Sequence, residues 1–209
     1  MGKHETGYPR VERDDYPSPA WVVTDALAEH IDLHGLIVWE FACGREGRMA
    51  RALRTAGCTR VYASDIGNGY ADQDEVLDFL SGQTPDLPRF DAGITNPPFG
   101  PRGKTAQAFI ERGLELLVSE YLDLLALLLP HDFDSARTRS HLFGDCPYFA
   151  GKSTLRRRVK WFEHPDQPRR SPKENTDWCL WSRPSPRVHR KPTILYAPSQ
   201  HGDNHGRRA

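Results

Sequence analysis

Short apolar runs alternate with helical segments along the first 130 residues of this chain. The runs cover residues 36–42, 61–64, 91–95 and 121–129, and the helical segments cover 21–31, 49–56 and 105–118. This alternation predicts strand-helix-strand units and a largely parallel β-sheet, because parallel strands are joined by crossover helices. The run 121–129 is almost continuously hydrophobic, which is typical of a strand buried on both faces.

The pattern changes after Pro130. Residues 154–162 and 178–181 have the composition of two further strands, and the connection between them, 164–173, is rich in proline and basic residues. A chain of 209 residues is long enough for one domain of ordinary size. By composition, residues 1–15 are expected to form a flexible arm, and residues 198–209 a disordered basic tail.

Charge is distributed unevenly, although the formal net charge is +0. Residues 1–150 carry 14 Lys and Arg against 23 Asp and Glu, whereas residues 151–209 carry 14 against 5. The two parts therefore have net charges of −9 and +9. A cationic C-terminal part next to an acidic body favours contact with a nucleic acid.

Several classes of protein fit the sequence poorly. Its 4 cysteines have no C-x-x-C spacing, so neither a zinc ribbon nor a disulfide framework is indicated. The longest apolar run, 124–129, is too short to span a bilayer, and the N-terminus lacks the apolar segment of a secretory signal. We therefore expect a cytoplasmic protein with no bound metal and no membrane partner.

Glu40, Gly44, Asp65 and Asn96 lie at or just after the ends of predicted parallel strands. Ligands collect at this edge of a parallel sheet, so we expect one site rather than four unrelated positions. A loop containing Gly44 and Gly47 lets the backbone approach a ligand closely, and Asp65 is well placed to accept hydrogen bonds from ribose hydroxyls. Because neither a P-loop lysine nor a G-x-G-x-x-G motif is present, the pattern predicts a nucleoside-containing cofactor without specifying which.

The tetrapeptide Asn96-Pro97-Pro98-Phe99 indicates the reaction. The exocyclic amine of a nucleobase is a poor nucleophile, because its lone pair is delocalised into the ring. Hydrogen bonds from the amine to the Asn96 side chain and to the Pro97 carbonyl would localise that lone pair, with Pro98 fixing the backbone. The Phe99 ring would offer a flat surface to a base removed from its stack.

These motifs resemble those of the class I S-adenosylmethionine-dependent methyltransferases, in particular the small phage-type or solitary enzymes that methylate adenine N6 in nucleic acids. The resemblance implies a single-domain Rossmann-like fold over residues 16–197, with a mostly parallel seven-stranded sheet, helices on both faces and a C-terminal antiparallel strand. It implies S-adenosylmethionine as cofactor, with Asn96, Pro97, Pro98 and Phe99 as the catalytic motif. The residues implied to bind the cofactor are Tyr16, Ser18, Pro19, Glu40, Ala42, Gly44, Gly47, Asp65, Asp78 and Phe79.

The sequence departs from the family pattern in two ways. The glycine loop, Gly44-Arg45-Glu46-Gly47, is one residue longer than the usual G-x-G, and no segment is long enough for a large target-recognition insertion. Residues 131–175 are therefore the candidate substrate-recognition region. Its basic side chains could contact phosphates; those singled out are Arg156, Arg157, Arg158, Lys160, Arg169 and Arg170.

The sequence predicts a methyltransferase acting on adenine N6 in DNA. Three alternatives remain open: an RNA adenine methyltransferase of the ribosomal type, a protein glutamine methyltransferase sharing the N-P-P signature, and a non-catalytic nucleic-acid-binding protein of the same fold.

Overall fold

The computed structural model describes residues 16–161, 172, 174–183 and 193–196. The predicted arm 1–15 and tail 198–209 lie outside the described residues, as does part of the predicted recognition region. Arg169 and Arg170 belong to that part.

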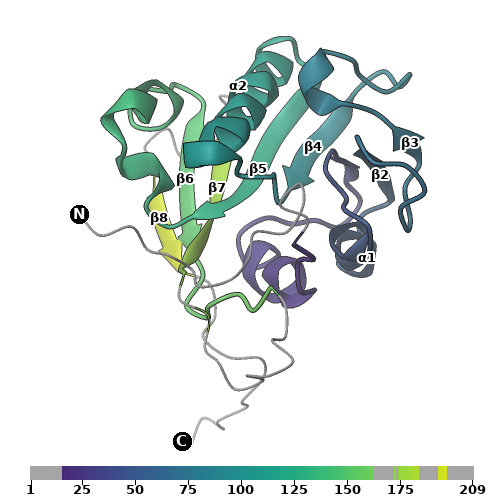
Figure 1. Cartoon of the computed structure of the whole chain (residues 1–209), viewed down its shortest axis with the longest axis horizontal. Coiled ribbons are helices and arrows are strands. Elements are labelled where there is room, and N and C mark those ends of the chain that lie inside the picture. The colour runs from purple at the N-terminus through teal and green to yellow at the C-terminus, as the bar shows by residue number, and fades with distance from the viewer. Residues whose placement is uncertain (1–15, 162–171, 173, 184–192, 197–209) are drawn as a thin grey trace, which may run out of the picture.

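A single β-sheet with the strand order β3-β2-β1-β4-β5-β7-β6-β8 runs through the molecule (Figure 1). Seven of its strands have four or more residues: β1 (Ile37–Glu40), β2 (Arg60–Asp65), β4 (Phe90–Thr95), β5 (Leu122–Pro130), β6 (Phe149–Thr154), β7 (Thr176–Ser182) and β8 (Thr193–Tyr196). The eighth, β3 (Glu75–Val76), is a two-residue strand at one edge. The strand runs predicted from the sequence included neither β3 nor β8. Only β7 runs against its neighbours β5 and β6, so the prediction of a mostly parallel sheet with a reversed C-terminal strand is confirmed.

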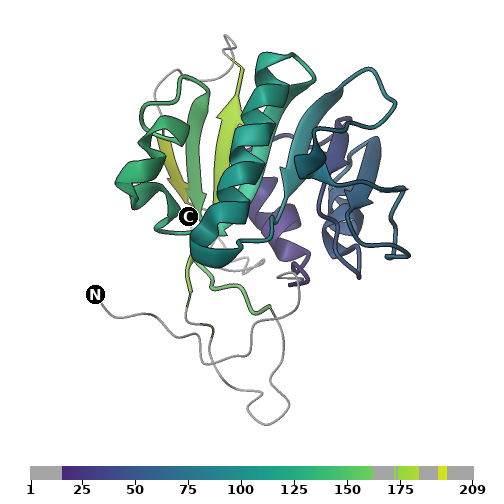
Figure 2. The ribbon, with the colours of Figure 1, turned by 45° about the horizontal axis from the view of Figure 1, so that its top comes forward.

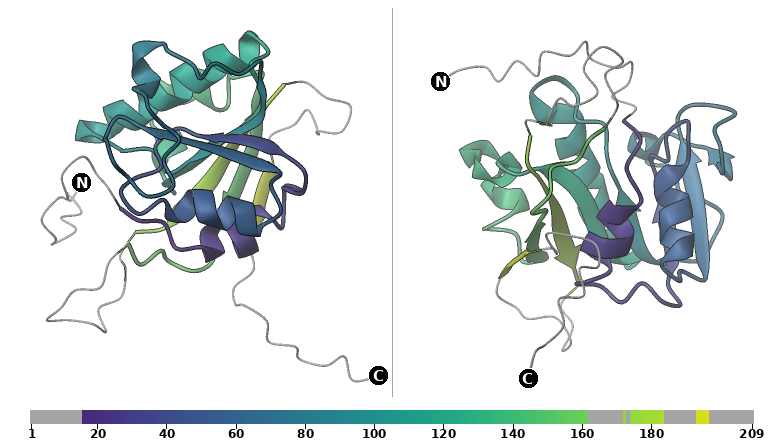
Figure 3. Two further views of the ribbon diagram at one scale, coloured as in Figure 1. Left: turned by 90° about the vertical axis from the view of Figure 1, so that its right-hand side faces the viewer. Right: turned by 90° about the horizontal axis from the view of Figure 1, so that it is seen from below.

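Helical segments lie above and below the sheet. The helix α2 (Lys104–Val118) packs on one face, and α1 (Arg48–Thr55) lies on the other with the π-helical segment Val22–Leu27 (Figure 3). Short 3-10 turns occupy Phe79–Ser81, Pro101–Gly103, Phe133–Ser135 and Arg137–Leu142. The last two lie beyond α2, beside the β6 end of the sheet (Figure 2). No helix in the described part of the chain is both long and apolar enough to cross a membrane.

The position of strand β5 in the sheet explains why the run 121–129 is almost continuously hydrophobic. Ala126 and Leu128 point into the core on the α1 side, whereas Leu125, Leu127 and Leu129 point into the core on the α2 side. Because successive side chains of a strand point to opposite faces, a strand covered on both sides needs apolar residues at every position. The β5 prediction is therefore confirmed.

One strand was predicted in the wrong place. The sequence favoured 154–162, but β6 ends at Thr154, and residues 155–161 continue without sheet pairing. Thr154 pairs with Asp177, and the N–H of Leu155 donates a last hydrogen bond to the carbonyl of Thr176, where β7 begins, so β7 offers no partner beyond Leu155. The actual strand contains Ala150, Gly151 and Lys152, whose low β-propensity concealed it in the sequence.

Candidate active site

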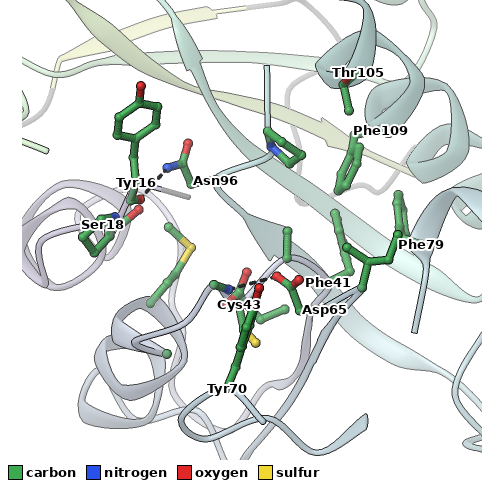
Figure 4. A pocket seen from close by; sticks show the side chains of 18 of the residues that line it. Tyr16, Ser18, Phe41, Cys43, Asp65, Tyr70, Phe79, Asn96, Thr105 and Phe109 are labelled. Carbon is green, nitrogen blue, oxygen red and sulfur yellow. Dashed lines mark hydrogen bonds between the residues drawn. The ribbon is translucent and has the colours of Figure 1, made fainter. Parts of the chain in front are cut away.

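A cavity of about 650 Å³ lies at the carboxyl ends of β1, β2 and β4 (Figure 4). This volume is within the usual range for a pocket that holds a small ligand or cofactor. Eleven of the fourteen predicted cofactor and catalytic residues line it: Tyr16, Ser18, Glu40, Ala42, Gly44, Gly47, Asp65, Asp78, Phe79, Asn96 and Pro98. The other three, Pro19, Pro97 and Phe99, are not part of its lining.

The lengthened glycine loop is tied to the loop that follows β2. The backbone N–H of Ala71 donates a hydrogen bond to the carbonyl of Arg45 over 3.0 Å. Gly47 has a φ of 57°, and a Cβ at this position would lie 2.3 Å from the carbonyl oxygen of Ala71. Only glycine fits there, because both the left-handed conformation and the close backbone approach exclude a side chain. The lengthened loop is thus held in place by the backbone at Ala71.

Asp65 fixes the geometry of the same loop. Its Oδ2 accepts a hydrogen bond from the N–H of Gly44 over 3.0 Å, and its Oδ1 accepts one from the N–H of Gly67 over 2.9 Å. A carboxylate oxygen can accept more than one hydrogen bond, so this arrangement leaves capacity for ribose hydroxyls. Asp65 therefore lies where a ribose-binding acid was predicted, and it also holds the loop.

Glu40 is a carboxyl group in an unusual environment. It is 0% exposed, and its Oε1 accepts a hydrogen bond of 2.5 Å from the hydroxyl of Thr95. Its Oε2 is buried and has no hydrogen-bond partner among the described residues. Burial raises the pKa of Glu40 to about 8, and the negative charge of Asp65 adds to this effect, while the Thr95 hydrogen bond opposes it.

The two residues of the predicted pair Asp78-Phe79 have different roles: Asp78 caps a turn, and Phe79 forms part of the cavity wall. Oδ1 of Asp78 accepts a hydrogen bond from the N–H of Leu80 over 2.9 Å, which caps the 3-10 turn Phe79–Ser81. The Phe79 ring stacks on Phe41, with centroids 4.0 Å apart and planes 8° from parallel. Both rings line the cavity, so this end of it has an aromatic wall.

Sequence reasoning missed several apolar and polar lining residues. Ile66 and Leu80 are 58% and 40% exposed and line the cavity from the loops after β2 and β3. Exposed aliphatic side chains of this kind provide surfaces for a flat ring. Position alone could have indicated Ile66, because it directly follows Asp65 at the strand end. The other lining residues that the sequence did not indicate include Met49, Tyr70, Thr105 and Phe109.

Asn96 lines the cavity, and one atom of its side-chain amide has no partner in the described part of the chain. Its Nδ2 donates a hydrogen bond to the backbone carbonyl of Tyr16 over 3.4 Å. Its Oδ1 is buried and has no partner among the residues that the structure describes. Buried polar atoms are normally satisfied, so an unsatisfied acceptor in a cavity indicates a donor supplied by a ligand.

The other three residues of the tetrapeptide differ in their surroundings. Pro97 is buried, Pro98 lines the cavity, and the half-buried Phe99 ring packs against the core on the α2 side. The next residue, Gly100, has a φ of 69°, and a Cβ there would lie 1.9 Å from Oγ1 of Thr105. The loop therefore turns tightly into α2.

The basic segment 155–161 is anchored at two points. Leu155 and Val159 are buried in the core on the α1 side. Arg158 donates hydrogen bonds to Oδ1 of Asn175 over 3.0 Å and to the carbonyl of Pro172 over 3.2 Å. The guanidinium of Arg157 lies 4.9 Å from the ring centroid of Trp21.

The exposed residues of this segment include Arg156 and Lys160. Its cations thus project from a fixed backbone, outside the lining of the cavity.

Among the described residues, no group of three or more His, Cys, Asp or Glu side chains could hold a metal ion.

The sheet order, the reversed strand β7 and a cavity at the carboxyl ends of β1, β2 and β4 define an α/β protein with a Rossmann-like fold. No protein-family model matches the sequence, and no curated protein matches it either. Solved structures do match.

A Pyrococcus horikoshii protein assigned as an RNA methyltransferase superposes with a TM-score of 0.59 and 18% identity, over 84% of this chain and 90% of that protein. This similarity shows that the chain has the fold of a methyltransferase.

Two further structures are more distant. A Listeria monocytogenes protein assigned as a class I S-adenosylmethionine-dependent methyltransferase has a TM-score of 0.47 and 13% identity, over 93% of this chain and 67% of that one. The 23S rRNA methyltransferase ErmE has a TM-score of 0.46 and 18% identity, over 78% of this chain and 68% of the enzyme.

Proposed function

We propose that this protein is an S-adenosylmethionine-dependent methyltransferase that modifies the exocyclic N6 amine of adenine in a nucleic acid. One observation carries the proposal: the unpaired Oδ1 of Asn96 is buried at the edge of a cofactor-sized cavity in a methyltransferase fold. Because a fold hosts many functions, the argument rests on the chemistry of this site.

The cavity fits the cofactor in its donor set and its shape. Asp65 and the N–H groups of the glycine loop lie at one end, suited to ribose, and Ile66 and Leu80 offer apolar surfaces to an adenine ring. Tyr16 and Ser18 lie at the other end, where the resemblance predicts the methionine carboxylate (Figure 4). When bound, S-adenosylmethionine supplies an electrophilic methyl group on a positively charged sulfur.

Asn96 acts on the amine that receives the methyl group. Its Oδ1 accepts a hydrogen bond from one N–H of the amine, and the Pro97 carbonyl accepts from the other. Together they hold the nitrogen pyramidal and its lone pair aimed at the methyl carbon. With the cofactor bound, the nitrogen would form its new bond to the methyl group as the carbon–sulfur bond breaks, and would then lose a proton to water. No strong base is required, because that proton leaves a nitrogen that has become positively charged.

Unpaired cations beside the tetrapeptide support a polyanionic substrate. Arg102, Lys104 and Arg137 are exposed, and none of them forms an ion pair with another described residue. Arg139 donates to the carbonyl of Arg102 over 2.8 Å, which brings the turn Arg137–Leu142 against the loop after Asn96.

Lys104 begins α2, where the helix dipole disfavours a cation. Its position there is explained if a phosphate group lies nearby.

DNA is the substrate that we expect from the resemblance to small solitary enzymes. RNA is the second candidate, favoured by the assignment of the Pyrococcus protein as an RNA methyltransferase. Phosphate contacts by Arg102, Lys104 and Arg156 serve either polymer. Transfer to a protein glutamine amide and binding without catalysis are the remaining outcomes.

The test offers tritiated S-adenosylmethionine to the full chain with duplex DNA, single-stranded DNA, structured RNA and a glutamine-containing peptide. We expect label on a nucleic acid, recovered as N6-methyladenosine or its deoxy form after digestion, with Asn96→Ala as the inactive control. Label on the peptide alone contradicts a nucleic-acid substrate. Calorimetry showing no binding of S-adenosylmethionine contradicts the enzyme assignment.

A further inference from the structure

Tyr70, in the loop between β2 and β3, lines the cavity but has no part in the function proposed above. Its side chain is half-buried, and the hydrogen bonds that it forms within the described part of the chain involve its backbone and not its hydroxyl. The guanidinium carbon of Arg45 lies 6.0 Å from the centroid of the Tyr70 ring, and this contact also leaves the hydroxyl unused. The phenol O–H is therefore available to a ligand.

The hydroxyl end of Tyr70 rests on the backbone of Gly67. A Cβ at Gly67 would lie 2.0 Å from Cζ and 2.1 Å from Oη of Tyr70, so any larger residue there would displace the ring. The N–H of the same Gly67 donates a hydrogen bond to Oδ1 of Asp65 over 2.9 Å. The phenol and the carboxylate are therefore neighbours, on the side of the cavity away from Asn96 (Figure 4).

Gln73 holds this loop in its shape. Its Nε2 donates hydrogen bonds to the carbonyls of Asp65 and Gly67 over 3.1 and 2.6 Å. Its Oε1 accepts a hydrogen bond from the N–H of Tyr70 over 3.2 Å. One side chain thus fixes the backbone at both ends of the segment from Asp65 to Tyr70, so the hydroxyl of Tyr70 is placed next to Asp65 before a ligand arrives.

The carboxylate and the phenol together meet the hydrogen-bonding needs of a ribose. A ribose hydroxyl both donates and accepts hydrogen bonds, whereas a carboxylate only accepts them. When Asp65 accepts from a ribose hydroxyl, the lone pairs of that oxygen still need a donor, because an unsatisfied acceptor in a site without water costs free energy. The O–H of Tyr70 supplies a donor at the same end of the cavity.

We propose that Tyr70 binds the ribose of the cofactor together with Asp65, its O–H donating to a ribose oxygen whose own proton is donated to the carboxylate. The inference rests on the proposed function, because it assigns a further residue to the same cofactor site. It makes the site selective for ribose over deoxyribose nucleosides, and it explains why a glycine stands at position 67.

Calorimetry on the full chain tests this contact, with S-adenosylhomocysteine and two analogues that each lack one ribose hydroxyl. Tyr70→Phe keeps the ring and removes one oxygen, so we expect it to bind S-adenosylhomocysteine about fivefold more weakly than the wild type, as loss of one hydrogen bond does. The loss should disappear with the analogue that lacks the contacted hydroxyl. An equal loss for all three ligands, or no loss for any of them, overturns the proposal.

Tyr62→Phe is the matched control. Tyr62 lies on β2 outside the lining of the cavity, and its hydroxyl donates a hydrogen bond to Oε2 of Glu75 over 2.7 Å. The substitution removes the same atom from a tyrosine that the proposal leaves away from the ligand, so the affinities for all three ligands should stay at the wild-type values. The same loss in Tyr62→Phe as in Tyr70→Phe would indicate a merely structural effect and contradict the ribose contact.

Gly67→Ala tests the position of the ring. Gly67 does not have a positive φ, so alanine adds no backbone strain there, but its methyl group displaces the Tyr70 ring. We expect this variant to lose the same selectivity between the ribose and deoxyribose ligands as Tyr70→Phe. Full selectivity in Gly67→Ala would show that the ring position is irrelevant and would overturn the proposal.

The two hypotheses fail in different ways. If the wild type binds S-adenosylhomocysteine and Tyr70→Phe binds it equally well, the ribose contact is wrong and the proposed function stands. If the wild type binds the cofactor with the expected selectivity and methylates no nucleic acid, the proposed function is wrong and the ribose contact stands.

Discussion

The side chain of Asn96 is held by the backbone of Tyr16, a residue 80 positions earlier in the chain, through a hydrogen bond of 3.4 Å. This contact uses the amide nitrogen and leaves Oδ1 buried without a partner among the described residues. The orientation of the acceptor is therefore set before substrate arrives, and preorganisation of this kind is the main source of catalytic stabilisation in many enzymes.

Replacing Asn96 by alanine removes that acceptor. We expect kcat for methyl transfer to fall by about 100-fold or more, which is the usual cost of one preorganised polar contact. The affinity for S-adenosylmethionine, measured by calorimetry, should change little, because the contacts proposed for the cofactor lie on other residues. Transfer by Asn96→Ala at the wild-type rate would show that the amine is activated in another way.

Gly47 tests the lengthened glycine loop. Gly47→Ala places a Cβ 2.3 Å from the Ala71 carbonyl, so the loop must shift and cofactor affinity should fall at least about tenfold, or 1.4 kcal/mol. Gly35→Ala is the matched control, because Gly35 also has a positive φ, of 83°, but a Cβ there meets nothing within 4 Å. It should lower stability by about 1–2 kcal/mol through backbone strain alone and leave cofactor binding intact.

Asparagine substitutions at Asp65 and Asp78 provide a second test with a matched control. Asp65 uses both oxygens to accept backbone N–H groups, so an asparagine must lose one of the two hydrogen bonds. Asp78 uses only Oδ1, which an asparagine can reproduce. Asp65→Asn should therefore weaken cofactor binding about tenfold or more, at roughly 1.5–3 kcal/mol per charge-assisted bond, whereas Asp78→Asn should stay close to wild type. Equal effects in calorimetry would contradict this difference.

Glu40 makes stability depend on pH. Its folded pKa, about 8, lies above the ordinary value of 4.5, so the folded state binds more protons than the unfolded state between these pH values. The free energy of unfolding should therefore fall as pH rises from 4.5 to 8 and change little through this group above that range.

The Glu40→Gln variant has no titratable group at this position. At pH 9 it should be more stable than the wild type by a few kcal/mol, since each pKa unit corresponds to about 1.4 kcal/mol, and the difference should vanish near pH 4. Parallel urea titrations at the two pH values measure this. A constant difference between the two proteins would exclude Glu40 as the titrating group.

Arg102 offers a substitution that removes charge without adding strain. It has a φ of 55°, which glycine tolerates better than arginine, so Arg102→Gly should not destabilise the fold. We expect weaker nucleic-acid binding and a salt dependence reduced by about one unit of slope for one lost phosphate contact.

Arg60→Ala is the control for that change. Arg60 begins β2, at the sheet edge opposite the strand ends that form the cavity. It should leave the salt dependence unchanged. The same slope in both variants would mean that the nucleic acid does not pass over Arg102.

The sequence and the structure agree best where one local pattern decides the outcome. Strand β5 and helix α2 follow from hydrophobic periodicity, and Glu40, Asp65 and Asn96 lie together because parallel strands end at one edge.

The predictions were wrong where contacts between distant segments of the chain determine the secondary structure. Strand β6 lies earlier than expected because its extent is set by where β7 begins, a contact between distant segments. The helical segment predicted over 21–31 covers only Val22–Leu27.

The sequence by itself therefore determined the parallel strands and the edge where the motifs gather, because these depend on local periodicity and on the order of strands. The reversed strand followed only from the family resemblance. Only the tertiary structure decided which atom of the Asn96 amide stays without a partner, that the half-buried Phe99 packs against the core on the α2 side and that Tyr16 lies beside Trp161. These outcomes depend on which side chains from distant segments fill the same space, and no local pattern records that competition.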